Sequence, residues 1–113
     1  MTISFENTYT PLPKSLTIKN SNTHGLGIFA VEDIDAGINL GLCRIFVKDE
    51  WIRTPLGGFI NHSENPNCIT VIKTGQSSFT MHGQEANLFT KTRIMMGDEI
   101  LLKYSMSEYQ PMP

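Results

Sequence analysis

Three short segments of the chain carry residues that could do chemistry, and the first is residues 56–67, which read LGGFINHSENPN. Asn61, His62 and Ser63 follow two adjacent glycines and a short apolar step. This mixture of turn formers and side-chain amides is typical of a loop whose polar groups serve a ligand or another backbone segment. Residues 56–67 therefore form the first candidate for a site, with little regular structure expected in them.

The second segment is the glycine-rich sequence GLGIFA at residues 25–30. It satisfies the glycine pattern of a dinucleotide-binding turn, but that turn must follow a strand and open a helix, whereas this one leads into a strand. Two interpretations remain open. The bare backbone approaches a ligand closely, or the glycines simply make a hairpin turn.

The third segment is ILLKY at residues 100–104. In a strand, Ile100, Leu102 and Tyr104 would share one face, so the Tyr104 ring should point inward. A buried tyrosine needs a hydrogen-bond partner for its hydroxyl, and taken alone it is more often a structural residue than a catalytic one. The other two tyrosines are Tyr9 and Tyr109, near the two ends of the chain.

The histidines and cysteines give no sign of a metal site. His24, His62 and His82 are far apart in sequence, and each alone is typical of a hydrogen-bonded structural residue. Cys43 and Cys68 lie in apolar contexts without C-x-x-C spacing, so we interpret them as small core residues rather than zinc ligands. No nucleophile motif is evident either.

Length and charge restrict the class of protein. A chain of 113 residues makes one domain, so any site shares its residues with the core. The formal net charge of -2, from 9 basic and 11 acidic residues, gives no broad attraction for nucleic acid or anionic lipid. There is no charged-then-apolar leader and no apolar run of membrane-span length. We expect a soluble, intracellular protein without direct nucleic-acid or membrane partners.

The elements that must position these segments are mainly β-strands. Residues 1–14 read as an arm, residues 106–113 as a tail and residues 49–54 as an uncertain connector. No stretch shows sustained helical periodicity. The alternation of apolar residues and the turn formers predict strands at residues 16–19, 28–31, 68–72, 78–81, 86–90 and 100–104, and one or two strands within residues 38–47.

The chain also matches itself at an offset of 60 residues. Each copy reads strand, polar connection, aliphatic residue, glycine turn and strand, which predicts two similar strand-turn-strand units whose aliphatic residue holds the turn against the core. The alternative is a coincidence of the kind that any β protein can show. The aligned positions are Phe29, Ile34, Gly37 and Leu40 on Phe89, Ile94, Gly97 and Ile100.

Taken in order, three segments resemble the SET-domain protein lysine methyltransferases. THGLGIFAVEDIDAGINL (residues 23–40) resembles their N-terminal motif, GGFINHSENPN (57–67) their asparagine-histidine loop, and GDEILLKY (97–104) their closing tyrosine motif. Order and spacing together are more specific than any one motif. The resemblance implies a β-clip set of small curved sheets over residues 15–105, with the tyrosine strand passing beneath the asparagine-histidine loop in a C-terminal pseudoknot.

The resemblance also implies a function and a set of site residues. The function is S-adenosylmethionine-dependent methyl transfer to a lysine amine of a protein substrate, such as a histone or another basic protein, with cofactor and lysine entering from opposite faces. Tyr104 falls on the catalytic tyrosine, and Tyr109 resembles an aromatic placed over the cofactor. The other cofactor contacts fall on His24, Gly25, Leu26, Gly27, Asn61 and His62.

This sequence departs from the family pattern at several points. The central insert, at about residues 42–58, is very short, so the usual wall of the peptide groove is in question. Gly58, Glu64 and Lys103 replace residues that the family commonly uses. The chain most resembles minimal, free-standing SET proteins of viruses and microbes, and a homodimer could complete the groove. The alternative function is a non-catalytic SET or β-clip module for interaction or cofactor sensing.

Overall fold

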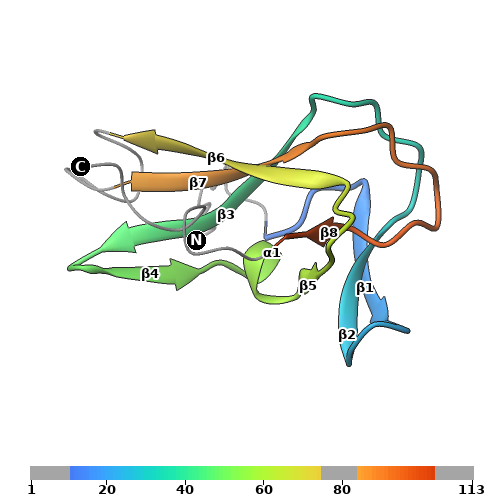
Figure 1. Cartoon of the computed structure of the whole chain (residues 1–113), viewed down its shortest axis with the longest axis horizontal. Coiled ribbons are helices and arrows are strands. Elements are labelled where there is room, and N and C mark those ends of the chain that lie inside the picture. Colours follow the sequence, from blue (N-terminus) through green and yellow to red (C-terminus); the bar gives the residue numbers. More distant parts are fainter. Residues whose placement is uncertain (1–10, 75–83, 104–113) are drawn as a thin grey trace, which may run out of the picture.

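The computed structural model describes residues 11–74 and 84–103. Most of these residues lie in strands, which confirms the prediction of a mainly β fold. In the described residues no helix is long and apolar enough to cross a membrane. In chain order the elements are β1 (Leu16–Asn20), β2 (Leu26–Ala30), β3 (Asn39–Val47), β4 (Glu50–Arg53), α1 (Pro55–Gly58), β5 (Asn61–His62), β6 (Cys68–Thr74), β7 (Gln84–Thr90) and β8 (Leu101–Leu102) (Figure 1).

The strands form three small sheets. β1 and β2 make an antiparallel pair, β4-β3-β7-β6 make an antiparallel sheet, and β5 and β8 pair in parallel. Figure 1 shows the β1–β2 pair at one end of the molecule, the four-stranded sheet at the other, and α1, β5 and β8 between them. The parallel pair brings the C-terminal strand alongside the asparagine-histidine loop, as predicted.

The core follows from the two-residue alternation of the strands. In β7, every second residue from Gln84 to Thr90 is buried, and β3 and β6 flank this strand on both sides. Cys43 and Cys68 are buried in the same core, which confirms that they are core residues. Burial raises the pKa of the Cys43 thiol to about 11 and that of Cys68 to about 12, so both thiols stay protonated.

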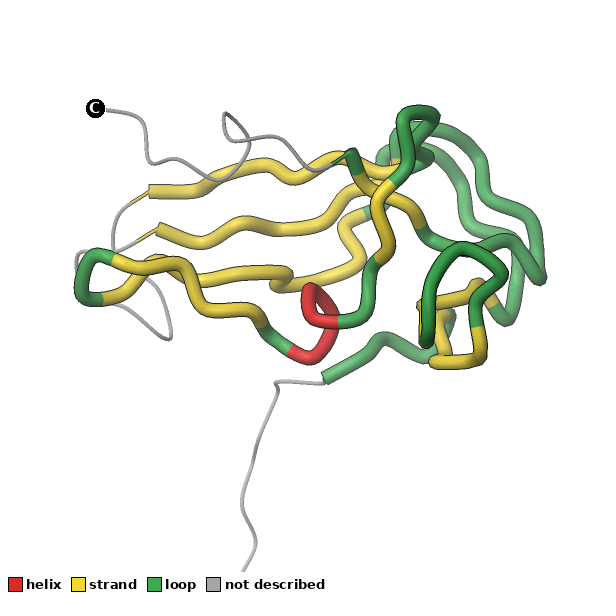
Figure 2. The backbone as a smooth tube through the Cα atoms, turned by 60° about the horizontal axis from the view of Figure 1, so that its bottom comes forward, coloured by secondary structure: helices red, strands yellow, loops and turns green. Residues whose placement is uncertain are grey.

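The repeat at an offset of 60 residues is a real structural repeat. Ile34 and Ile94, the two aliphatic residues of the repeat, are both buried and exchange two backbone hydrogen bonds of 2.7 and 2.8 Å. The two glycines of the repeat, Gly37 and Gly97, both adopt positive φ, at 79° and 93°. The two copies are therefore paired with each other, and Figure 2 shows their connections running side by side.

Further hydrogen bonds follow the same symmetry around the Ile34–Ile94 pair. Each copy contributes an equivalent donor and acceptor, with distances that agree within 0.1 Å. The pairs are Ala30 N to Asp98 O (2.9 Å) with Thr90 N to Ile38 O (2.9 Å), and Gly97 N to Ala30 O (2.8 Å) with Gly37 N to Thr90 O (2.8 Å).

The connector at residues 49–54 is largely a strand. β4 pairs antiparallel with β3, and the two-residue turn between them places Lys48 and Asp49 at positive φ, 51° and 68°. Such turns match the twist of a hairpin but usually contain glycine or asparagine, so a lysine followed by an aspartate did not predict this one. Phe46 and Trp51 pack against each other across the hairpin, with ring centroids 5.3 Å apart and ring planes tilted by 53°.

Residues 56–67 contain more regular structure than expected. Thr54 caps the single turn of α1: its side chain accepts a hydrogen bond from Gly57 N and lies 2.6 Å from Leu42 O, to which it donates. Pro55 opens the turn, a position that suits its fixed φ. The expectation of little regular structure was therefore wrong for residues 56–58 and 61–62, because contacts to β3 hold a helical turn too short to show periodicity and β5 pairs with β8.

Several predicted features fall outside the described residues and stay predictions. They are the strand at 78–81, residues 1–10 of the arm, the tail, and every expectation for His82, Tyr9, Tyr104 and Tyr109. Of the strand predicted at 100–104, only Leu101–Leu102 is assigned within the described part.

The two adjacent glycines of α1 provide a test of this packing. A Cβ on Gly57 would overlap the carbonyl oxygen of Cys43, whereas a Cβ on Gly58 would meet no atom within 4 Å. We expect Gly57→Ala to lower the free energy of unfolding by about 1 to 3 kcal/mol, as overpacked sites do. Gly58→Ala should be neutral or slightly stabilising. Urea denaturation of both variants measures this difference, and equal effects would contradict the packing.

Candidate functional site

A concave pocket of about 530 Å³ lies where the first and second candidate segments meet. Residues 23–26, in the turn before β2 and at its first position, form one wall. Residues 58–62, from the end of α1 to β5, form the other. Arg53, the last residue of β4, completes the lining. The pocket thus brings together five of the predicted site residues: His24, Gly25, Leu26, Asn61 and His62.

The turn before β2 is shaped by Ser21 and Gly25. Ser21 N donates to Gly25 O at 2.7 Å, and the Ser21 hydroxyl accepts from the backbone N–H of Thr23 at 2.9 Å. Gly25 adopts a positive φ of 48°, which a side chain would disfavour. The hairpin-turn interpretation is therefore confirmed, and the same turn forms a wall of the pocket. The close approach of its backbone to a ligand stays a prediction.

Gly27 lies outside the pocket lining. A Cβ at this position would overlap Oε2 of Glu99 and crowd the Asn61 amide nitrogen at 3.1 Å. The bare backbone at Gly27 is therefore approached by a carboxylate of the protein, which sequence reasoning did not foresee.

Asn61 ties the two walls of the pocket together. Its amide nitrogen donates to the carbonyl oxygens of His24 and Leu26, both at 3.1 Å, and to Oε2 of Glu99 at 2.8 Å. Three acceptors surround a group that carries two hydrogens, so this nitrogen is engaged by the protein itself. Asn61 is therefore a clasp on the glycine turn as well as a lining residue.

His62 connects the pocket to the C-terminal strand. Its Nε2 lies 3.2 Å from Oε1 of Glu64, and Nζ of Lys103 lies 3.4 Å from the other carboxylate oxygen. The hydrogen bonds from His62 and Lys103 lower the pKa of the Glu64 carboxyl. Glu64 and Lys103, two of the departures from the family pattern, thus contact each other beside His62.

Strand β8, which precedes Tyr104 in the sequence, pairs with the pocket strand β5. Asn61 pairs with Leu101 and His62 with Leu102, and Ser63 N donates to Leu102 O at 3.1 Å. Tyr104 and Tyr109, the predicted catalytic and cofactor-covering residues, lie outside the described residues.

Sequence reasoning missed several lining residues, above all Arg53. No local motif marks Arg53, because the β3–β4 hairpin brings it to the pocket. Its side chain is exposed and forms no hydrogen bond or ion pair with the residues that the structure describes. Phe59 and Ile60 add apolar surface beside it.

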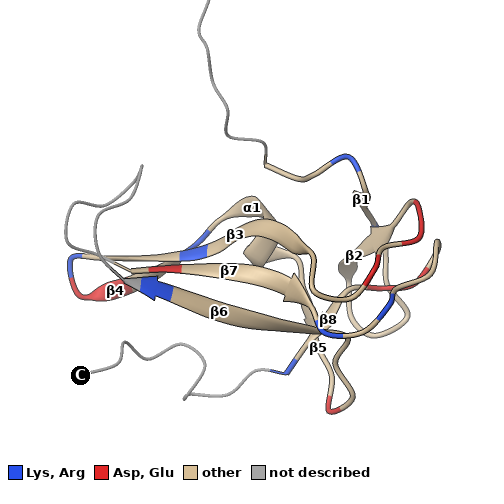
Figure 3. Ribbon diagram, turned by 90° about the horizontal axis from the view of Figure 1, so that it is seen from above, with Lys and Arg blue, Asp and Glu red and all other residues tan. Residues whose placement is uncertain are grey.

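Metal ligands and charge add no second site. Across residues 11–74 and 84–103, no group of three or more His, Cys, Asp or Glu side chains is placed to hold a metal ion. Figure 3 shows Lys and Arg at both ends of the molecule, with Asp and Glu also at both ends.

The clasp role of Asn61 can be tested without any ligand. We expect Asn61→Ala to lower the free energy of unfolding by about 1 to 2 kcal/mol, because two carbonyl groups and a carboxylate lose their donor. Asn61→Asp should be worse, since its carboxylate faces three acceptors. Asn65→Asp, at an exposed position, is the matched control. Thermal unfolding of the three variants measures this order, and equal stability of Asn61→Asp and Asn65→Asp would refute the clasp.

Comparison with known proteins bears on the whole arrangement. The family model of the SET domain matches residues 43–105. No curated protein sequence matches the chain. Among solved structures, a Plasmodium falciparum protein assigned to the histone methyltransferases is similar with a TM-score of 0.67 at 21% identity, over 83% of this chain and 96% of that one.

A second similar structure is Chaetomium thermophilum Polycomb Repressive Complex 2 bound to S-adenosylmethionine, with a TM-score of 0.65 at 16% identity. The match covers 87% of this chain but only 16% of that much longer one. At such identities the structural likeness shows a shared fold. Because the SET model also matches more than half of the sequence, the chain belongs to the SET domain family.

Proposed function

We propose that this SET domain is an S-adenosylmethionine-dependent methyltransferase that modifies a lysine side chain of a protein. The observation that carries the proposal is that the glycine turn and the asparagine-histidine segment converge on one pocket. The match to the SET family and the likeness to a complex bound to S-adenosylmethionine support it.

The pocket suits a ligand of this chemistry. Its volume of about 530 Å³ falls in the range of about 300 to 1,000 Å³ that small-molecule sites occupy. Phe59, which is 38% exposed, offers apolar surface for an adenine ring, and the backbone groups of residues 24–26 can bond polar ligand atoms. Arg53 is matched to the carboxylate of the methionine moiety, because a guanidinium binds a carboxylate through two hydrogen bonds.

S-adenosylmethionine supplies a methyl group activated by a positively charged sulfur. The acceptor lysine must be neutral to accept it, although a free lysine amine has a pKa of about 10.4. Exclusion of water and a neighbouring positive charge both lower that pKa. The protein therefore has to desolvate and orient the amine, and no acid-base pair is required for the transfer itself.

We assign the orienting role to Tyr104. Its hydroxyl would accept a hydrogen from the amine and align the lone pair with the methyl group. Support comes from β8, which ends two residues before Tyr104 and pairs with the pocket strand β5. The substrate is proposed to be a basic protein, such as a histone.

The direct test is calorimetry with S-adenosylmethionine, followed by mass spectrometry of a mixture of basic proteins. The protein should bind the cofactor and add mass increments of one methylene to lysine. Tyr104→Phe should keep the cofactor affinity and lose about a hundredfold or more in turnover. A parent protein that shows no binding at millimolar cofactor would rule out the proposed activity. Binding without methylation would favour the alternative of a ligand-sensing module.

Arg53 gives a separate prediction about the orientation of the cofactor. We expect Arg53→Gln to raise the Kd for S-adenosylmethionine about tenfold, because a charge-assisted pair with the carboxylate is lost. Decarboxylated S-adenosylmethionine should bind Arg53→Gln and the parent protein equally.

The matched control for Arg53 is Arg93→Gln. Arg93 lies outside the pocket, where it contacts Asp35 at 2.5 Å and Asp33 at 3.5 Å. Isothermal titration of both variants with both ligands measures the effect. An equal loss of affinity for both ligands in Arg53→Gln would overturn the assignment of the carboxylate to Arg53.

A further inference from the structure

We propose that Glu99 is a positioning residue that sets the affinity for the cofactor by holding both walls of the pocket in place. This inference rests on the proposed function, because it names the residue that organises the site. Glu99 is not a lining residue of the pocket, and no motif of the sequence analysis assigned it a role. It directly precedes the third candidate segment and lies five residues before Tyr104, within the GDEILLKY motif.

The Glu99 carboxylate contacts the turn that forms the first wall. The Ser21 hydroxyl donates to its two oxygens at 2.8 and 2.9 Å, and the Thr23 hydroxyl lies 3.5 Å from one of them. Ser21 in turn accepts hydrogen bonds from Thr23 N at 2.9 Å and His24 N at 3.4 Å. The carboxylate therefore fixes the backbone of the turn through one intermediate side chain.

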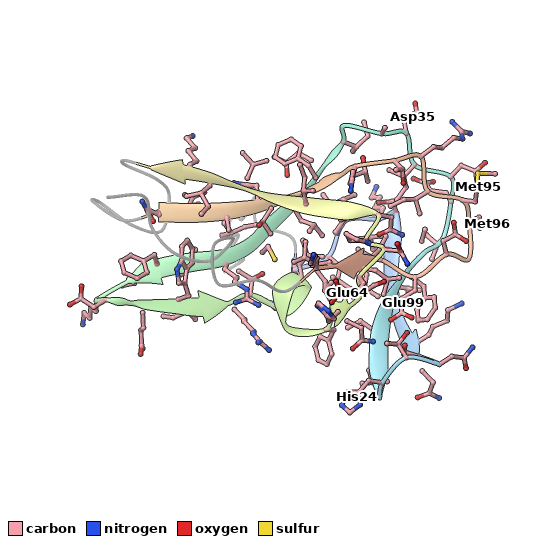
Figure 4. The ribbon with its side chains drawn as sticks, in the orientation of Figure 1. His24, Asp35, Glu64, Met95, Met96 and Glu99 are labelled. Carbon is pink, nitrogen blue, oxygen red and sulfur yellow. The ribbon has the colours of Figure 1, made fainter. Side chains whose placement is uncertain are left out.

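The same carboxylate contacts the second wall through Asn61. The Asn61 amide nitrogen donates to Oε2 of Glu99 at 2.8 Å while it also holds the carbonyl oxygens of His24 and Leu26. The Glu99 side chain thus bonds both to the turn before β2, through Ser21, and to the asparagine-histidine segment, through Asn61. In Figure 4, Glu99 lies between β2 and β8, whereas His24 projects at the far end of β2.

The backbone of Glu99 is itself held firmly. It forms a bridge with Phe29 of β2, and its carbonyl oxygen accepts a hydrogen bond from the Asn67 side chain at 2.8 Å. The Asn67 side chain also accepts from Leu101 N at 2.8 Å. The carboxylate therefore projects from a fixed point toward an exposed turn, which is the arrangement that positioning requires.

Gly27 adds independent evidence for the importance of this carboxylate. Its φ is not positive, so the turn geometry does not call for glycine there. A methyl group at Gly27 would instead overlap Oε2 of Glu99. Glycine at position 27 therefore leaves the space that the Glu99 carboxylate occupies when it bonds to Ser21 and Asn61.

The expected effect follows from the population of the ordered turn. Residues 22–25 are exposed, and the hydrogen bonds that hold them run to Ser21, Asn61 and Glu99. If loss of Glu99 reduces the fraction of molecules with an ordered turn to about one tenth, the apparent Kd rises about tenfold.

A series of substitutions at Glu99 separates positioning from simple attraction of a positively charged ligand. Glu99→Gln keeps the length of the side chain and an oxygen that both Ser21 and Asn61 can reach, so its Kd for S-adenosylmethionine should stay within about threefold of the parent value. Glu99→Ala and Glu99→Asp should raise the Kd about tenfold, because the first lacks the group and the second is too short. An attraction of charge predicts the reverse order for Gln and Asp.

Isothermal titration with S-adenosylmethionine is the primary measurement, with Glu85→Ala on β7 as the control outside the pocket. Hydrogen exchange of the backbone amides of residues 23–26 gives a second measurement without cofactor. Exchange at residues 23–26 should be faster in Glu99→Ala than in Glu99→Gln. Exchange in β6 and β7 should be the same in both variants. If Glu99→Ala does not fold, Ser21→Ala replaces it in both measurements, and it should also raise the Kd for S-adenosylmethionine.

The outcomes distinguish this proposal from the proposed function. A parent protein that does not bind S-adenosylmethionine removes the proposed function and this inference with it. A parent that binds, with Glu99→Ala or Ser21→Ala within about twofold of its affinity, overturns the positioning role alone. Aspartate that restores binding while glutamine does not would also overturn it.

Discussion

The site depends on the hydrogen bonds that residues 98–102 make on both of their sides. Toward β2, Asp98 O accepts from Ala30 N at 2.9 Å, and Ile100 N donates to Ile28 O at 2.7 Å. Toward the asparagine-histidine loop, β8 pairs in parallel with β5. Because this one segment satisfies the backbone of both neighbours, the glycine turn and Asn61 lie next to each other although they are far apart in sequence.

The structural repeat explains how so small a chain can hold that segment in place. Ile34 and Ile94 are buried and their backbones bond to each other. The connections that contain them, one in each copy of the repeat, therefore stabilise each other. The first copy is followed by β3, which joins the four-stranded sheet. The second copy is followed by residues 98–102, which lie beside β2 and β5 next to the pocket. The same local geometry thus builds the core at one end and the site at the other.

The sequence allowed prediction of whatever a local pattern or an ordered set of motifs encodes. The mainly β class, the positions of most strands, the repeat and the SET family are of this kind. β4 was uncertain because Lys48 and Asp49 adopt a turn that seldom uses such residues. Arg53 and Glu99 were missed because their roles arise from contacts between segments distant in sequence. Gly27 was noticed as a glycine, but only the structure shows that its neighbour is a carboxylate.

The central claim is that the glycine turn and the asparagine-histidine segment form one cofactor site. Titration of isotope-labelled protein with S-adenosylmethionine, followed by the chemical shifts of its backbone amides, tests this claim most directly. The shifts should change at residues 23–26 and 60–62 and at the Arg53 side chain, with little change around Met95 and Met96 at the repeat connection. No saturable change, or changes confined to that connection, would contradict the account.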